Sequence, residues 1–169
     1  MTTIPAEKGA RVWFALVGFI AAAFVAGAIG SAATFENVRT WYPTLVKPSW
    51  NPPNWLFGPV WTTLYVFMGI AAWRAWRRRH MLGAAELGVR AVVKLYFVHL
   101  VANALWSILF FGLKQPAWAL AEIVVLWAMI AWIQFRLVKI DGIAAALWAP
   151  YLAWVSFASF LNFTIVRLN

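Results

Sequence analysis

The chain has 169 residues, of which 64% are hydrophobic and 11% are charged, and its formal net charge is +9 at pH 7. Soluble domains are typically ~45–50% apolar and ~25% charged, so this composition excludes an ordinary soluble globule. Cysteine is absent, which excludes disulfides, thiolate nucleophiles, iron–sulfur clusters and thiolate zinc sites.

Five long runs of apolar residues predict five membrane-spanning helices. The expected spans cover approximately residues 12–33, 55–75, 92–113, 117–137 and 143–165. Each run reaches the ~20 residues with which a helix crosses a hydrocarbon core of ~30 Å, and alternating strands of a membrane barrel are not evident. The expected fold class is therefore an all-α integral membrane protein, with residues 1–169 forming a single five-helix domain.

Lysine and arginine are divided unevenly between alternate connections. Ten of the fourteen lie before the first span, between the second and third, or after the fourth, and four lie on the other side. The positive-inside rule then predicts a cytoplasmic N-terminus, and it explains the basic charge without nucleic acid. Binding of anionic lipid is the alternative explanation for one cluster, which consists of Arg74, Arg77, Arg78 and Arg79. Helical spans favour an inner bacterial membrane.

The first span carries small residues at every fourth position, which allow a second helix to approach closely. These residues are Gly18, Ala22, Ala26 and Gly30. Packing within the chain is the preferred interpretation, and a dimer interface is the alternative.

Between the first two spans, residues 36–54 contain four prolines and few residues that sustain a helix. Proline fixes its own φ and biases the preceding residue toward extended geometry, so this segment is expected to be stiff. We interpret it as a structured lid over one end of the bundle. A loop that merely closes the bundle is the alternative.

Three predicted spans carry stripes in which aromatic side chains alternate with polar ones at helical spacing. The stripes consist of Phe57, Trp61, Tyr65 and Met68; of His99, Asn103, Trp106 and Phe110; and of Tyr151, Trp154, Ala158 and Leu161, followed by Asn162. If the stripes converge, they form a lipophilic ligand pocket with a few hydrogen-bonding groups. Hydrogen bonding between packed helices is the alternative.

The ingredients of conventional catalysis are scarce. His80 and His99 are the two histidines, so no metal site is expected, and Glu122 is the single carboxylate at membrane depth. His99 as a haem ligand and Glu122 as a functional acid are weaker hypotheses than hydrogen bonding and a helix-end position. No cofactor is required by these residues.

Aromatic residues and prolines form a pattern over nearly the whole chain. The segment from Trp41 to Tyr65 reads WYPTLVKPSWNPPNWLFGPVWTTLY. Matching positions follow at Asn103, Trp106, Phe110, Phe111, Trp148, Pro150, Tyr151, Trp154, Leu161 and Asn162. This pattern resembles the translocator protein family, which includes bacterial tryptophan-rich sensory proteins and the mitochondrial peripheral benzodiazepine receptor.

The resemblance implies a five-helix bundle, usually a homodimer, in a bacterial inner or outer membrane. It implies binding of porphyrins such as protoporphyrin IX, haem-related tetrapyrroles, sterols, and synthetic isoquinoline or benzodiazepine ligands. The implied pocket residues are Tyr42, Pro52, Phe57, Trp61, Tyr65, Asn103, Trp106, Trp154 and Ala158. A receptor or regulator of tetrapyrroles is therefore the expected function.

Two further properties of the family bear on this sequence. In some bacterial relatives, tryptophans at the positions of Trp61 and Trp154 are tied to porphyrin breakdown that depends on light and oxygen, so a degrading enzyme is an alternative function. A porphyrin or sterol transporter is another. The family's sterol motif survives here only as Leu161, Phe163 and Arg167, without its tyrosine, which makes sterol binding doubtful.

Overall fold

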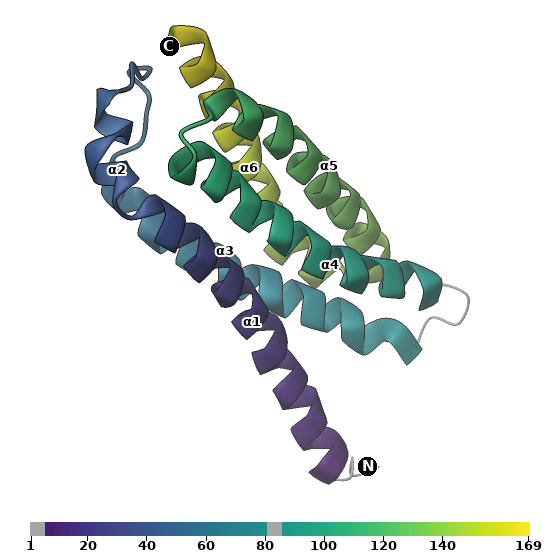
Figure 1. Ribbon diagram of the computed structural model, residues 1–169. Coiled ribbons are helices and arrows are strands. Elements are labelled where there is room, and N and C mark those ends of the chain that lie inside the picture. The colour runs from purple at the N-terminus through teal and green to yellow at the C-terminus, as the bar shows by residue number, and fades with distance from the viewer. Residues whose placement is uncertain (1–5, 81–85) are drawn as a thin grey trace.

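Long helices make up most of the computed structural model, which describes residues 6–80 and 86–169 (Figure 1). They are α1 (Ala6–Thr34), α3 (Asn54–Arg77), α4 (Glu86–Ser107), α5 (Pro116–Ile140) and α6 (Gly142–Leu168). All five are long and apolar enough to cross a membrane, and the described residues contain no β-strand. The predicted fold class is confirmed.

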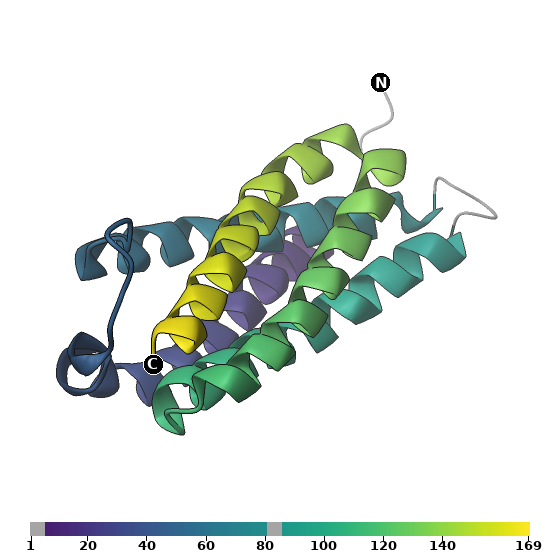
Figure 2. The same cartoon turned by 90° about the horizontal axis from the view of Figure 1, so that it is seen from above.

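The helices form a closed ring, because α1 packs on α3, α3 on α6, α6 on α5, α5 on α4 and α4 again on α1. Figure 2 shows these helices from above, with α6 in yellow and α5 in green side by side. The N-terminal part of α1 projects beyond the other helices (Figure 1). The start of α1 and the end of α6 lie at opposite ends of the bundle (Figure 1).

Small residues bring α1 close to its neighbours. A Cβ atom at Gly69 would lie 2.8 Å from the Cα atom of Ile20, and one at Gly30 would lie 3.0 Å from the Oγ atom of Ser107. Ala26 is also buried, whereas Gly18 is exposed and a Cβ there would meet nothing within 4 Å. Packing within the chain therefore accounts for Ala26 and Gly30, but not for Gly18.

The segment between α1 and α3 contains more helix than its sequence predicts. It forms α2 (Asn37–Thr40) and a 3-10 turn, η1 (Tyr42–Thr44). It then continues without helix to Pro53, with one turn at residues 49–50 that the N–H of Asn51 closes on the carbonyl of Pro48 at 3.0 Å. Pro43 is compatible with η1 because it stands in the first turn, where its missing N–H costs nothing. The expectation of a segment with little helix is thus corrected for its first half.

The lid is attached to α6 at two places. Trp50 stacks on Phe160, with their ring centroids 5.3 Å apart. The side chain of Asn169 accepts a hydrogen bond of 3.0 Å from the backbone N–H of Val46 and donates one of 3.1 Å to its carbonyl. Segments that lie more than a hundred residues apart in sequence thereby close one end of the bundle (Figure 1).

The remaining connections are short. The π-helical turn η4 (Ile108–Gly112) follows α4, and Lys114 adopts a left-handed φ of 54° before Pro116 opens α5. Asp141 separates α5 from α6 and caps α6 by accepting a hydrogen bond from the N–H of Ala144. At the same end of the bundle as Asp141, α4 begins at Glu86, six residues before the predicted span.

Candidate ligand-binding cavity

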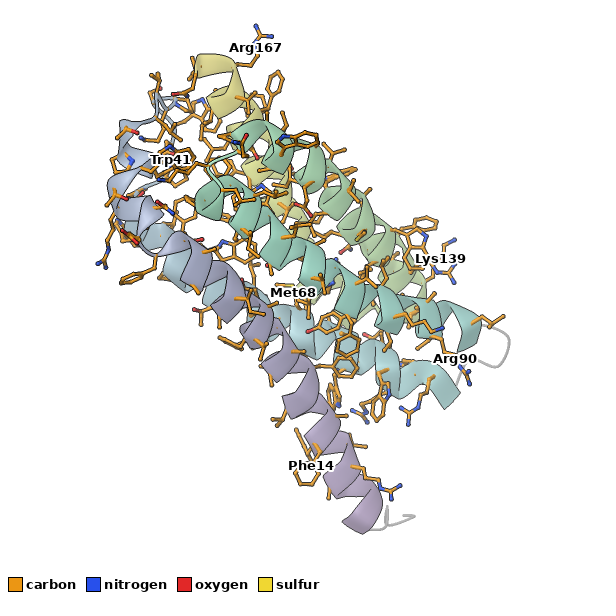
Figure 3. The ribbon with its side chains drawn as sticks, in the orientation of Figure 1. Phe14, Trp41, Met68, Arg90, Lys139 and Arg167 are labelled. Atoms are coloured by element: carbon orange, nitrogen blue, oxygen red, sulfur yellow. The ribbon has the colours of Figure 1, made fainter. Side chains whose placement is uncertain are left out.

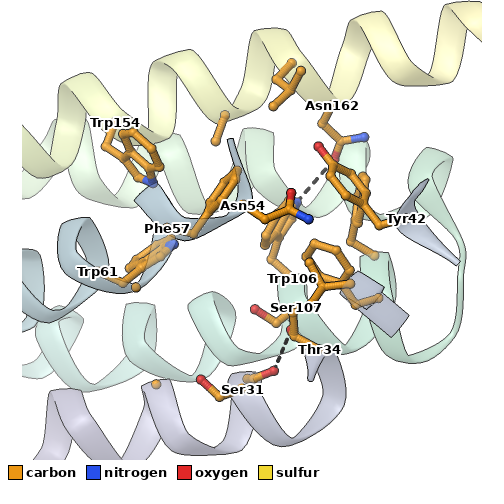
Figure 4. Close-up of a pocket in the computed structure, with 18 of the residues that line it drawn as sticks. Ser31, Thr34, Tyr42, Asn54, Phe57, Trp61, Trp106, Ser107, Trp154 and Asn162 are labelled. Carbon is orange, nitrogen blue, oxygen red and sulfur yellow. Dashed lines mark hydrogen bonds between the residues drawn. The ribbon is translucent and has the colours of Figure 1, made fainter. Parts of the chain in front are cut away.

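A cavity of about 460 Å³ lies inside the helical ring, beneath the lid (Figure 4). Side chains from α1, α3, α6 and the end of α4 line it, and Val38 and Tyr42 of the lid segment complete the wall. Ligand pockets typically enclose ~300–1,000 Å³ and are mostly apolar, so this cavity has the size of a small-molecule site.

The wall from α3 carries aromatic residues on successive turns. Phe57, Trp61 and Tyr65 all line the cavity, as the predicted stripe requires. The rings of Trp61 and Tyr65 are 5.4 Å apart, and Phe57 meets Trp154 of α6 edge to face at 5.8 Å. Met68, one turn further along, is fully buried in the helical core instead. The two indoles therefore face the same space from different helices (Figure 4).

The wall from α6 combines aromatic and polar groups. Trp154, Ala158 and Leu161 line the cavity together with Asn162. Of the residues that remain of the sterol motif, Leu161 thus points inward, whereas Phe163 is 45% exposed and Arg167 lies exposed at the end of the helix. The three residues do not form one surface.

The end of α4 contributes a dense aromatic cluster. Trp106 and Phe110 stack with their centroids 5.2 Å apart, and Phe110 contacts Phe111 at 4.8 Å. The wider π-helical turn places both phenylalanines in the cavity wall, together with Trp106 and Ser107. The sequence predicted Trp106 and Phe110 as ligand contacts, but it did not predict Ser107 and Phe111.

Tyr42 closes the cavity from the lid side. Its side chain is 3% exposed, its hydroxyl donates a hydrogen bond of 2.6 Å to Oδ1 of Asn51, and its ring contacts Phe111 at 5.6 Å. Burial raises the pKa of Tyr42 to about 12, although the Asn51 hydrogen bond acts in the opposite direction. The phenol therefore stays protonated and remains a donor at physiological pH.

The basic residues near the lid do not line the cavity. The Nζ atom of Lys47 donates hydrogen bonds to the carbonyls of Tyr42 at 2.7 Å and Leu45 at 2.9 Å, and it lies over the Tyr42 ring. The guanidinium of Arg39 lies over the ring of Phe35 at 4.3 Å. Both cations thus stabilise the lid rather than face the cavity interior.

The wall from α1 was not predicted. Its lining residues are Phe24, Gly27, Ala28, Gly30, Ser31 and Thr34. Gly27 lies directly against the ring of Tyr65, so the absence of a side chain there makes room for the phenol. Ser31 and Thr34 bring hydroxyl groups to the cavity (Figure 4). The sequence feature that could have indicated this wall is the presence of two hydroxyl residues, Ser31 and Thr34, in an otherwise apolar run.

Four predicted ligand contacts lie outside the lining: Pro52, His99, Asn103 and Tyr151. The amide of Asn103 donates a hydrogen bond of 3.2 Å to the hydroxyl of Tyr151, in the core of the bundle. His99 is fully buried, and its Nδ1 contacts the carbonyl of Tyr96. Hydrogen bonding between packed helices, the alternative interpretation, accounts for Asn103 and Tyr151, because their stripes continue below the cavity floor. His99 lies in the same core, but its Nδ1 contact stays within α4. Pro52 stays in the lid.

His99 is enclosed by aromatic rings. The centroids of Tyr96, Trp148 and Tyr151 lie 5.3, 5.2 and 5.7 Å from the imidazole. This position is not one from which His99 would ligate a haem in the cavity. Among the described residues, no three His, Asp or Glu side chains are grouped as metal ligands would be, and Glu122 is not in the lining.

The chemistry of the lining is lipophilic and uncharged. It contains indole, phenyl and phenol rings, a few hydroxyls, and the amides of Asn54 and Asn162 (Figure 4). Aromatic faces favour flat ligands, and a small number of polar groups orients them. The cavity therefore suits a flat, largely apolar molecule with polar substituents.

Five apolar helices in a ring of this kind define a multi-pass integral membrane protein, with an aromatic cavity between its helices. The chain belongs to the TspO/MBR family, whose sequence model matches residues 19–168.

Individual relatives match over most of their length. The chain is 42% identical over 147 residues to the tryptophan-rich protein TspO of Chlorobaculum tepidum, covering 85% of this chain and 88% of the relative. It is 37% identical over 158 residues to the tryptophan-rich sensory protein of Cereibacter sphaeroides, covering 93% and 92%. It is 34% identical over 157 residues to the human translocator protein, covering 93% and 91%.

Proposed function

We propose that this protein is a membrane receptor or regulator that binds a tetrapyrrole, protoporphyrin IX or a haem-related molecule, in the aromatic cavity beneath the lid. The observation that carries the proposal is the meeting of Trp61, Trp106 and Trp154, from three different helices, around one space of about 460 Å³. Membership of the TspO/MBR family supports a role as a membrane receptor or regulator.

The cavity suggests an orientation for the ligand. The macrocycle stacks on the indoles of Trp61 and Trp154, where π faces are available. No cation lines the described cavity, so the porphyrin carboxylates point toward the lid end, where Asn54 is exposed. Synthetic isoquinoline or benzodiazepine ligands are proposed to compete for the same space. A sterol would have to do so without Phe163 and Arg167 of the motif remnant, which are outside the lining. Assembly as a homodimer and a cytoplasmic N-terminus stay predictions.

A second candidate function is porphyrin breakdown that depends on light and oxygen. It is favoured by the position of Trp61 and Trp154, since both indoles line the space that a bound photosensitiser would occupy. No conventional acid or base is needed, because the excited porphyrin and oxygen supply the oxidant. Transport is a third possibility, which requires net movement of porphyrin across a closed vesicle.

The proposal is tested by titrating the purified protein in nanodiscs with protoporphyrin IX in the dark. Binding is followed by the Soret absorbance of the porphyrin and by tryptophan quenching, with free tryptophan as the inner-filter control. Trp61→Phe and Trp154→Phe are compared with Trp118→Phe, because Trp118 is 68% exposed and outside the cavity.

Saturable binding that weakens in the two cavity variants but not in Trp118→Phe supports the proposal. A linear, non-saturable signal that is the same in all variants means that porphyrin only partitions into lipid. Repeating the titration under light then separates receptor from enzyme: a double Trp61→Phe, Trp154→Phe variant that forms breakdown products as fast as wild type excludes the degrading role.

A further inference from the structure

A second, smaller cleft lies at the end of the bundle opposite the lid. It has a volume of about 280 Å³. Its described lining consists of Arg74 and Arg77 from the end of α3, Arg78 from the 3-10 turn η2 (Arg78–His80), and Asp141. The aromatic cavity shares none of these residues. The function proposed above makes no use of this cleft.

Asp141 holds two of the three arginines in place. Its Oδ1 accepts hydrogen bonds from Nε of Arg74 at 3.1 Å and from the N–H of Ala144 at 2.9 Å. Its Oδ2 accepts from Nη2 of Arg74 at 3.0 Å and from Nε of Arg78 at 3.2 Å. The carboxylate is buried and occupied on both oxygens, so it orients the guanidinium groups and leaves their remaining N–H groups as donors.

Arg77 is positioned independently of Asp141. Its guanidinium lies 4.8 Å from the ring centroid of Trp73, which stacks in turn on Trp13 of α1 at 6.2 Å. The indole N–H of Trp73 donates a hydrogen bond of 2.9 Å to the carbonyl of Val12. This chain of contacts fixes the third cation beside the cleft.

The net positive charge of the cleft favours binding of an anion. Three guanidinium groups face one carboxylate, which leaves two positive charges in excess. Guanidinium groups present planar N–H donors that match the oxygens of a phosphate, and such charge-assisted hydrogen bonds are stronger than neutral ones. A phosphate group therefore suits the cleft in its charge and in the kind of hydrogen-bond donors that line it.

The position of the cleft at the ends of two membrane spans indicates that its phosphate group belongs to a lipid. Arg77 is the last residue of the α3 span, and Asp141 directly precedes the α6 span. The indoles of Trp13 and Trp73 lie at the same end, and tryptophan is enriched at the membrane interface. Ile143, two residues from Asp141, is 58% exposed and offers an apolar surface for an acyl chain. The cleft thus lies at the depth of lipid headgroups.

We propose that this cleft binds the phosphate headgroup of an anionic phospholipid from the leaflet that surrounds the end of α3. The positive-inside rule alone requires only that basic residues stand in this connection. It does not require a buried carboxylate that locks Arg74 and Arg78, or an aromatic support for Arg77. The cleft is separate from the porphyrin proposal, so either proposal can fail without the other.

The test measures which lipids the purified full-length protein retains. Wild type is equilibrated in detergent with equal amounts of phosphatidylglycerol and phosphatidylcholine, and bound lipids are counted by native mass spectrometry. Arg77→Gln removes a cation that lines the cleft but makes no bond to Asp141. The matched control is Lys139→Gln: Lys139 lies at the same end of the bundle, over Phe135 and outside the cleft (Figure 3).

We expect one saturable phosphatidylglycerol site in wild type, an affinity about fivefold lower in Arg77→Gln, and no change in Lys139→Gln. Unchanged thermal unfolding and porphyrin titration of Arg77→Gln show that the variant is folded. An equal loss in both variants, or no preference over phosphatidylcholine, overturns the proposal. Displacement of the lipid by millimolar glycerol phosphate also overturns it, because the site then takes soluble phosphate.

Discussion

The indole N–H of Trp106 donates a hydrogen bond of 3.2 Å to Oδ1 of Asn162, and the amide of Asn162 donates one of 2.9 Å to the carbonyl of Pro116. These two bonds tie α4, α6 and the start of α5 together at the cavity wall. Asn162 is buried, so neither of its partners can turn to water without opening the bundle. One side chain thus joins three helices beside the cavity.

Replacement of Asn162 by leucine is expected to destabilise the protein by about 1–2 kcal/mol, because the change removes both interhelical hydrogen bonds. Thermal unfolding in detergent measures the loss. A double-mutant cycle with Trp106→Phe isolates the bond between the two side chains, for which we expect a coupling of about 1 kcal/mol. Strictly additive effects of the two changes would show that the bond contributes nothing.

Gly27→Ala is expected to weaken ligand binding with little effect on stability. A Cβ at this position collides with the outer atoms of the Tyr65 ring, which can rotate into the cavity. Gly18→Ala is the matched control on the same helix, since a Cβ there meets nothing within 4 Å. Protoporphyrin titration and thermal unfolding are measured for both variants. If the two bind porphyrin equally well, Tyr65 does not shape the occupied volume.

The five helices could be predicted because uncharged runs of sufficient length leave a membrane chain few alternatives. The contribution of α3 to the cavity could also be predicted, because Phe57, Trp61 and Tyr65 repeat at helical spacing and so lie on one face of the helix. Helical spacing, however, identifies a face of a helix and not a depth along it. The stripes on α4 and α6 therefore included Asn103 and Tyr151, which lie in the core below the cavity.

Two parts of the cavity that sequence reasoning missed, at Gly27 and Phe111, depend on backbone geometry. Gly27 contributes by the absence of a side chain, and its effect is visible only once Tyr65 is placed opposite. Phe111 enters the wall because the helix widens into a π-helical turn, which shifts it relative to a regular α-helix. Neither effect has a distinctive residue pattern.

Asp141→Ala is expected to destabilise the folded protein at neutral pH by about 1–2 kcal/mol, the sum of a lost helix cap and of partly exposed ion pairs. Burial by itself raises the pKa of this carboxyl, but the Ala144 N–H and the Arg74 and Arg78 guanidiniums lower it further, so the net pKa lies below its ordinary value. Folding therefore favours the ionised form.

The sign of the pH dependence follows from that depressed pKa. The stabilisation is fully present above the ordinary carboxyl pKa of ~3.9 and is lost as the pH falls through the lower pKa of the folded state. We expect the difference in unfolding temperature between wild type and Asp141→Ala to be constant from pH 7 to 5 and to shrink below about pH 4. A difference that grows on acidification would contradict this assignment. Lys139→Gln serves as the control for general charge effects.

Tyr42→Phe is expected to speed ligand release, because it removes the 2.6 Å hydrogen bond to Asn51 that joins two parts of the lid. The ring contacts with Phe110 and Phe111 are kept, so the loss should be confined to lid closure and amount to a few-fold increase in the dissociation rate, as for one hydrogen bond of about 1 kcal/mol. Stopped-flow displacement of protoporphyrin IX measures this rate.

The control for the lid experiment is Thr44→Val, which removes an exposed hydroxyl from the same segment and leaves the Tyr42–Asn51 bond intact. Because burial raises the pKa of Tyr42 to about 12, the phenol donates throughout the neutral range. The ratio of the Tyr42→Phe and wild-type rates should therefore be the same at pH 6 and pH 9. Equal rates for Tyr42→Phe and Thr44→Val would mean that the ligand leaves by a route that does not require the lid to open.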